Sequence, residues 1–299
     1  VYQTGSLRSD AAVQFSIAYG EVKGSGSAPY NTLVTGSSPT RVTYGQYRTL
    51  VNGDENTNFN FGVGNTDSRD MYVINVNRAR YKEKLFPGTF NLVVSGSDGS
   101  VASKIQLTDN SKDVTTLTYT DAGRVFDIVS GSDGSAVSDI VTGSVTAGYT
   151  PSGSYGKFLP DVGLVLLNPR ALALSASEGG IGLVVNNDLT NVALVANNNA
   201  LFNSIKLAST FSMNSEETIT SDYIFVRVRN TDFNYTTNPS MISGSGEFVY
   251  SSLINNPQTF ITTVGLYNDA TELLSVAKLS KPLVKDFTKE ALVRVKLDF

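Results

Sequence analysis

Carboxylates are the side chains of this sequence with the most potential for chemistry. The chain has 27 Asp and Glu residues but no His or Cys, which excludes every catalytic arrangement that needs an imidazole or a thiolate. A glycosidase needs two carboxyl groups that face each other across the bond to be cleaved. Candidate pairs are Glu216 with Glu217 and Asp161 with Asp127, but sequence neighbours on a turn do not supply that geometry. We therefore predict no catalytic residue.

Motifs for nucleophiles, phosphates and metals are incomplete as well. Ser100, Ser103 and Lys104 are out of register for a Ser-x-x-Lys nucleophile. The Gly-rich stretches 24–27 and 179–182 lack the Lys-Ser/Thr of a phosphate loop and do not complete G-x-G-x-x-G. A heptapeptide, VSGSDGS, occurs at 94–100 and again at 129–135, and one Asp per copy is too few for a calcium loop. The sequence thus predicts no cofactor, no metal and no enzyme.

Composition narrows the class of protein further. The chain is 40% hydrophobic and 17% charged, with a net charge of -4 and a pI near 5.0. Nucleic acid is bound through basic faces, so we expect no direct nucleic-acid partner. Because no apolar run approaches the length of a membrane span, we expect no membrane partner either. The first residue is Val, not Met, so a leader or longer N-terminal part is expected to be missing.

Period-two alternation of apolar residues dominates the chain and indicates strands. Strands are expected over 13–19, 71–76, 89–94, 101–107, 114–119, 125–129, 163–167, 223–229, 259–265, 273–277 and 292–299. Helix is expected at 198–208 and, briefly, from Pro169 to Leu174, with a third helical turn around 285–291. Asp98-Gly99 and Asp133-Gly134 suit type I′ turns, so both heptapeptides are interpreted as hairpin tips.

These elements predict a mainly β fold with antiparallel sandwich-like or barrel-like sheets, one or two short helices and long extended loops. The loops are expected over 24–40, 143–156 and 230–246, as arms that order on a neighbour. Residues 1–299 are expected to form one β-rich structural unit, with a division into 1–150 and 151–299 as the alternative. An attachment hairpin is expected within 259–299.

Four cations alternate at Arg78, Arg80, Lys82 and Lys84. In an extended strand all four would project from one face and form a positive stripe on an acidic protein. Three interpretations are open: a solvated strand face, a docking stripe for an acidic partner surface, and a phosphate site. We take the docking stripe as the interaction candidate.

The C-terminal third carries a resemblance to a known class of proteins. Residues 263–269, followed by 272–278, Lys281-Pro282 and a final strand, resemble a segment of virion structural proteins of tailed bacteriophages. Similar hairpins occur in the baseplate-proximal parts of tail fibre and baseplate proteins. Segments 79–84, 87–88, 155–158, 160–163 and 166–169 resemble uncharacterised structural proteins of large myovirus-like phages, including cyanophages.

The resemblance implies a structural component of the virion, in the tail, baseplate or neck, that is assembled in the bacterial host cytoplasm. Its partners would be other virion proteins and copies of itself in a ring, joined by sheet-edge pairing and hairpin docking. Candidate contacts of the attachment hairpin are Gly265, Leu266, Tyr267 and Lys278. Two other classes stay open: a capsid decoration or glycan- or receptor-binding fibre module, and a depolymerase enzyme.

Overall fold

The computed structural model divides the chain into two compact units, Val1–Glu217 and Thr218–Phe299, here called the first unit and the second unit. It describes residues 12–28, 30, 33, 38–62, 67–96, 104–137, 148–185, 191–208, 210–236 and 238–299, except the side chains of 191–195 and 252. Within these residues, no helix combines the length and apolar character needed to cross a membrane.

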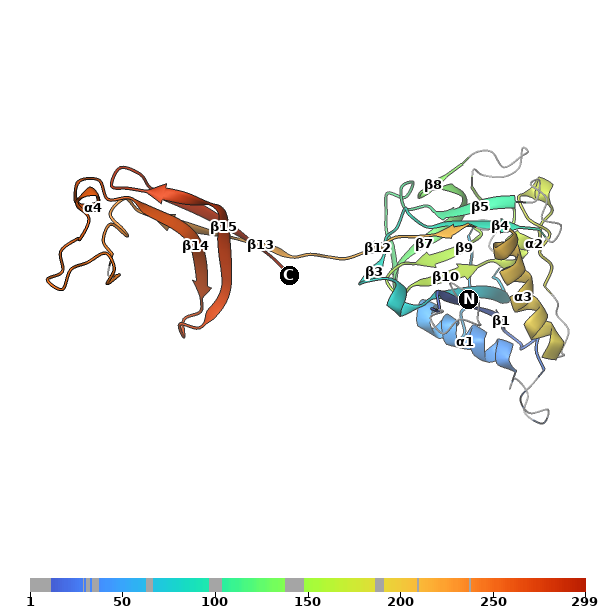
Figure 1. The fold of residues 1–299 in the computed structure, drawn as a ribbon. Helices are drawn as coiled ribbons and strands as arrows, with labels where there is room; N and C mark the ends of the chain where they lie inside the picture. The colour runs from blue at the N-terminus through green and yellow to red at the C-terminus, as the bar shows by residue number, and fades with distance from the viewer. Residues whose placement is uncertain are drawn as a thin grey trace. The chain divides into compact units, whose positions relative to one another are not determined.

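An antiparallel sheet dominates the first unit (Figure 1). Its strand order is β1-β2-β10-β9-β7-β5-β4-β11, and β6 and β8 pair with β7. These strands are β1 (Phe15–Glu21), β2 (Asp70–Val76), β4 (Asn91–Ser95), β5 (Lys104–Asp109), β6 (Thr118–Thr120), β7 (Gly123–Ser132), β8 (Ser135–Ala136), β9 (Gly156–Leu159), β10 (Leu164–Leu167) and β11 (Phe211–Ser212). A separate pair joins β3 (Lys84–Leu85) to β12 (Ser215–Glu216). The predicted mainly β fold is confirmed.

The sheet curls until its two ends meet, which gives it the predicted barrel-like form. Phe15 of β1 contacts Phe211 of β11 edge to face, with ring centroids 4.9 Å apart, although these strands stand at opposite ends of the strand order. Helix α3 (Asn191–Ala208) packs against both β1 and β4. Its Leu201 and Ile205 join the large apolar cluster enclosed by the curl.

Strands at the centre of the sheet are buried on both faces. In β10, Val165 and Leu167 belong to the enclosed cluster, whereas Leu164 and Leu166 join a second cluster on the opposite face. Helix α1 (Pro39–Asn52) contributes Tyr44 to that second cluster and packs on β1. Burial on both sides explains why the sequence of β10 is a continuous apolar run with no alternation.

The expected helices are confirmed at α2 (Pro169–Ala173) and in the C-terminal part of α3. Helix α1, in contrast, is not among the expected elements, because its first residues, Pro39 and Thr40, fall within the expected loop 24–40. Ser38 is an extended N-cap residue (φ -85°, ψ 144°), Pro39 occupies the first turn, and left-handed Gly53 (φ 66°) ends the helix. These are ordinary start and stop signals of a helix. A short 3₁₀ segment, η3 (Ala176–Glu178), follows α2.

The second heptapeptide forms the predicted hairpin tip. Ser132 pairs with Ser135, and the two residues between them, Asp133 and Gly134, have positive φ angles of 51° and 87°. That geometry is the type I′ turn expected from Asp-Gly. In the first copy β4 and β5 pair as an antiparallel hairpin up to Ser95 and Lys104, and the Asp98-Gly99 turn lies outside the described residues.

The second unit contains two separate two-stranded sheets. One pairs β13 (Ser221–Val228) with β16 (Ala291–Asp298), and the other is the hairpin of β14 (Thr259–Tyr267) and β15 (Leu273–Lys285). A short helix, α4 (Ser251–Asn255), precedes β14. The expected helical turn at 285–291 is instead a non-helical turn between β15 and β16.

The chain divides after Glu217, whereas the sequence led us to expect one β-rich unit or, as the alternative, a division at residue 150. Strands β9 and β10 lie beyond that point, yet they pair with β7 and β2 and complete the first sheet. Of the three expected loops, 24–40 and 143–156 lie partly outside the described residues, and the first also includes the start of α1. The third, 230–246, is described except for residue 237 and consists mainly of turns.

Candidate functional site

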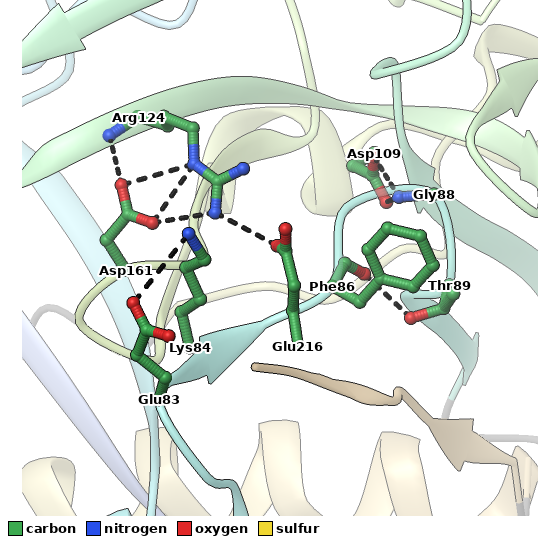
Figure 2. A network of polar contacts seen from close by, with 9 residues as sticks. All are labelled: Glu83, Lys84, Phe86, Gly88, Thr89, Asp109, Arg124, Asp161 and Glu216. Atoms are coloured by element: carbon green, nitrogen blue, oxygen red, sulfur yellow. Dashed lines mark hydrogen bonds and ion pairs between the residues drawn. The ribbon is translucent and has the colours of Figure 1, made fainter. Parts of the chain in front are cut away.

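A polar network centred on Arg124 lies where the first unit ends (Figure 2). Arg124, on β7, donates from Nη2 to Asp161 Oδ1 at 2.8 Å and to Glu216 Oε2 at 3.3 Å. Its Nε and backbone N–H also donate to Asp161, at 3.0 and 2.7 Å. Lys84 and Glu83 complete the network with an ion pair at 3.9 Å.

Backbone geometry lets these side chains meet. Asp161 lies in the turn between β9 and β10, and its carboxylate rests against Gly123, which immediately precedes Arg124. A Cβ atom on Gly123 would stand 2.5 Å from Asp161 Oδ2, and the residue has a φ of 98°. Only glycine therefore allows the Asp161 carboxylate to close on the start of β7. Glu216 reaches the network because β12 pairs with β3.

The network holds the Asp161 carboxylate ionised. Burial alone would raise the pKa of Asp161, but hydrogen bonds from the side chain and backbone of Arg124 together lower the pKa below its usual value. A general acid needs the opposite shift, so Asp161 suits a structural ion pair and not proton donation. The suggested partner, Asp127, forms a different ion pair with Lys157, at 2.5 Å.

The same region fastens the last residues of the first unit to its sheet. Phe86 N–H donates to Asn214 O at 2.9 Å, and Asn214 N–H donates to Thr89 Oγ1 at 3.0 Å. Thr89 Oγ1 in turn donates to Phe86 O at 2.7 Å (Figure 2). Lys82 forms an ion pair with Glu217. Residues 211–217 are thus held by two short strand pairings, by side-chain hydrogen bonds and by two cations.

The expected positive stripe is wrong in its geometry. Residues Arg78–Arg80 form a 3₁₀ turn, η1, because the side chain of Asn77 caps it by accepting from Ala79 N–H at 2.9 Å. Arg78 folds back over the ring of Tyr81, with its Cζ 4.7 Å from the ring centroid. The other three cations have separate surroundings. Arg80 lines a cavity of about 310 Å³ beside β11, whereas Lys82 forms an ion pair with Glu217 and Lys84 forms one with Glu83. The four cations therefore do not share one extended face.

A buried acidic cluster lies at the paired ends of β1 and β2, and the sequence analysis missed it. Asp70 accepts from Tyr19 Oη at 3.3 Å and from Ser68 Oγ at 3.4 Å, and burial raises the pKa of its carboxyl. Burial also raises the pKa values of the Tyr19 and Tyr72 hydroxyls. The hydroxyl of Tyr72 is buried without a hydrogen-bond partner among the described residues. These side chains come together through the register between β1 and β2, and no local sequence motif indicates that register.

The hairpin predicted within 259–299 is present as β14 and β15, and its role in attachment stays a prediction. Gly265 pairs with Val276 and Thr263 with Lys278, so these residues and Tyr267 share one face, while Leu266 pairs with Ser275 on the other. Tyr267 lies over Gly265: a Cβ there would be 2.9 Å from Tyr267 Cε2 and 3.5 Å from Leu273 Cδ1. The face is open to solvent, with Tyr267 62% and Val276 55% exposed.

Apolar exposure extends over the whole second unit. It contributes only four of the 38 buried apolar side chains in the described chain, but 17 of the 29 large apolar side chains that are exposed. The four buried ones are Val228, Ala291, Val293 and Val295. Both apolar clusters belong to the first unit. Within its described residues, then, the second unit covers little of its own apolar surface.

No protein-family model matches the chain, and no significant match was found among curated proteins or solved structures.

Proposed function

We propose that this protein is a structural component of a tailed-phage virion, located in the tail, baseplate or neck, and that it acts by joining neighbouring subunits. The first unit supplies a self-sufficient body, and the second unit supplies the joining surface. The observation that carries the proposal is the imbalance of burial: a unit that buries four apolar side chains and exposes 17 is completed by contact with another protein surface.

Strand geometry supports the same role. Isolated two-stranded sheets are marginally stable in water and need further strands or a packed face. The second unit has two such sheets, so added strands or a docked surface would stabilise it. The ion-paired state of Asp161 also favours structural over catalytic use of the carboxylates in the Arg124 network.

The test is association with particles. Particles from a lysate that contains the protein are banded on a density gradient and analysed by mass spectrometry, and a chain truncated before Thr218 is compared with the full chain. We expect the full chain to band with particles at constant stoichiometry and the truncated chain to stay at the top of the gradient. A full chain that never bands with particles would overturn the proposal.

Exposed tyrosines favour a second candidate, the glycan- or receptor-binding fibre module. Tyr223, Tyr235, Tyr250 and Tyr267 are each at least half exposed in the second unit, and aromatic rings with a polar tip are frequent in recognition surfaces. Binding of the full chain to immobilised host envelope glycans, lost in Tyr235→Ser or Tyr267→Ser variants, would favour this candidate over the joining role.

A further inference from the structure

Strand β14 is an edge strand without charge or proline, and its pairing with β15 shifts register between Ile261 and Thr263 and between Leu266 and Tyr267. Its only partner in the described residues is β15, and no backbone hydrogen bond outside the hairpin involves residues 259–267. An open edge presents unpaired N–H and C=O groups to any strand that approaches, so proteins protect such edges with charges or proline.

The other strands of the second unit carry that protection. Strand β15 contains Lys278, Lys281, Pro282 and Lys285, and both β13 and β16 contain arginine. Strand β14, with the sequence TFITTVGLY, has no charge and no proline over nine residues, and most of its residues favour strands. Among these four strands, β14 is the one whose composition favours pairing with a further strand.

The surface around β14 suits a second copy of the same chain. The second unit has eight basic and eight acidic residues and so no net charge, which removes the like-charge repulsion that opposes self-association. Six exposed large apolar side chains lie on the hairpin: Phe260, Tyr267, Leu273, Leu274, Val276 and Leu283. Phe260 and Tyr267 lie on β14 itself and would contribute directly to a contact along this edge, whereas the other four lie on the paired strand β15.

We propose that two copies of this protein join through β14, which pairs antiparallel with β14 of the second copy across a two-fold axis to form one four-stranded sheet. The proposal rests on the proposed joining function and names its partner. A two-fold contact uses the same patch on both copies. The axis passes by Thr263, the middle residue of the strand, so that each Thr263 faces its counterpart.

A charge at the axis gives the first test. Thr263 is exposed and pairs with Lys278 inside its own hairpin. Thr263→Glu therefore adds a favourable cross-strand pair within one copy but places two carboxylates opposite each other between copies. The matched control is Ser280→Glu, at a site on β15 that is also exposed. Sedimentation equilibrium of the full chain should give about twice the 32.0 kDa monomer mass for the unaltered protein and the control, and at least a tenfold weaker dimer for Thr263→Glu.

A single cysteine gives the second test, because the chain has none of its own. Thr263→Cys should form a symmetric disulfide dimer under mild oxidation, and Ser280→Cys should not, since directly opposed residues of an antiparallel pair come within disulfide reach. A monomeric unaltered chain, an unweakened Thr263→Glu dimer, open-ended fibres, or preferential crosslinking at Ser280→Cys would each overturn the two-fold pairing. The density-gradient experiment is independent of these results, so the joining function can stand if this pairing fails.

Discussion

Replacing Arg124 by methionine tests whether the polar network stabilises the first unit. The change keeps an apolar stem of similar length and removes the guanidinium from between Asp161 and Glu216. Two carboxylates, with side chains 27% and 30% exposed, would then lose their shared cation. Because the β9–β10 turn and β12, which carry these carboxylates, are far apart in sequence, the loss should weaken their packing on β7.

The expected loss follows from the contacts. Hydrogen bonds to charged groups contribute about 1.5–3 kcal/mol when they are shielded from water, and the Arg124 side chain is 18% exposed. Solvent screening reduces the total well below the sum of the individual contacts, so we expect the free energy of unfolding to fall by about 2–3 kcal/mol. For a unit of this size, in which each kcal/mol shifts Tm by about 2–4 °C, that corresponds to a decrease in Tm of about 4–12 °C.

The assay is urea unfolding of the full chain, followed by circular dichroism at pH 7 and near pH 3. The folded-state pKa of Asp161 is lowered, so its stabilising contribution is present above the unfolded-state pKa and is lost as the pH falls through the folded-state pKa. The penalty of Arg124→Met should therefore shrink at the lower pH. Arg227→Met is the control, because its ion pair with Glu290 is exposed and should be worth less than about 1 kcal/mol. A penalty below that of the control, or one equal at both pH values, would refute the reasoning.

Three further predictions concern single side chains. The raised pKa of Asp70 means that its contribution to stability is present below the unfolded-state pKa and is lost as pH rises through the folded-state value; Asp70→Asn should thus raise Tm at pH 7 and leave it unchanged near pH 3, and a decrease at pH 7 would contradict this. Lys285 is fully buried and its ammonium donates to Asn230 O at 3.0 Å, to Asp232 O and to Asn234 Oδ1 at 2.5 Å; Lys285→Met should make residues 230–236 sensitive to proteolysis, whereas unchanged resistance would show that the ammonium does not order that loop. Gly134→Ala should cost about 1–3 kcal/mol in chemical unfolding, because the added Cβ would stand 2.7 Å from Gly88 Cα at a positive φ, and a loss below about 0.5 kcal/mol would mean that the turn relaxes freely.

Much of the fold could be predicted because many of its strands have a recognisable local sequence pattern. Alternation located β1, β7, β13 and β16, and the Asp-Gly dipeptide located the β7–β8 turn. Helix α1 was missed although its signals are present. The pair Ser38-Pro39 can begin either a turn or a helix, and the signal that favours a helix is its stop at Gly53, fourteen residues beyond Pro39. The extended stripe failed for a similar reason: the Asn77 cap outweighed the alternation of charges that follows it.

The sites could not be predicted, because pairing between distant strands creates them. Arg124 meets Asp161 and Glu216 only after β7, the β9–β10 turn and β12 have reached their places, and the sequence separations of 37 and 92 residues carry no local signal. The Asp70 cluster likewise depends on β1–β2 register. The hairpin of β14 and β15 was the exception, since both strands and the turn between them are contiguous in the sequence.

The contacts that hold residues 211–217 on the first unit would have a mechanical role if the second unit joins subunits. A joining surface transmits to its own body any force applied at the interface, and the chain enters the second unit directly after Glu217. Short strand pairs alone, such as β11 with β4 and β12 with β3, contain two residue pairs each and would peel easily. The Arg124–Glu216 and Lys82–Glu217 ion pairs lie at the last two positions before the second unit, where peeling would begin. Their position, more than their individual strength, therefore makes them suited to resist separation of this segment from the sheet.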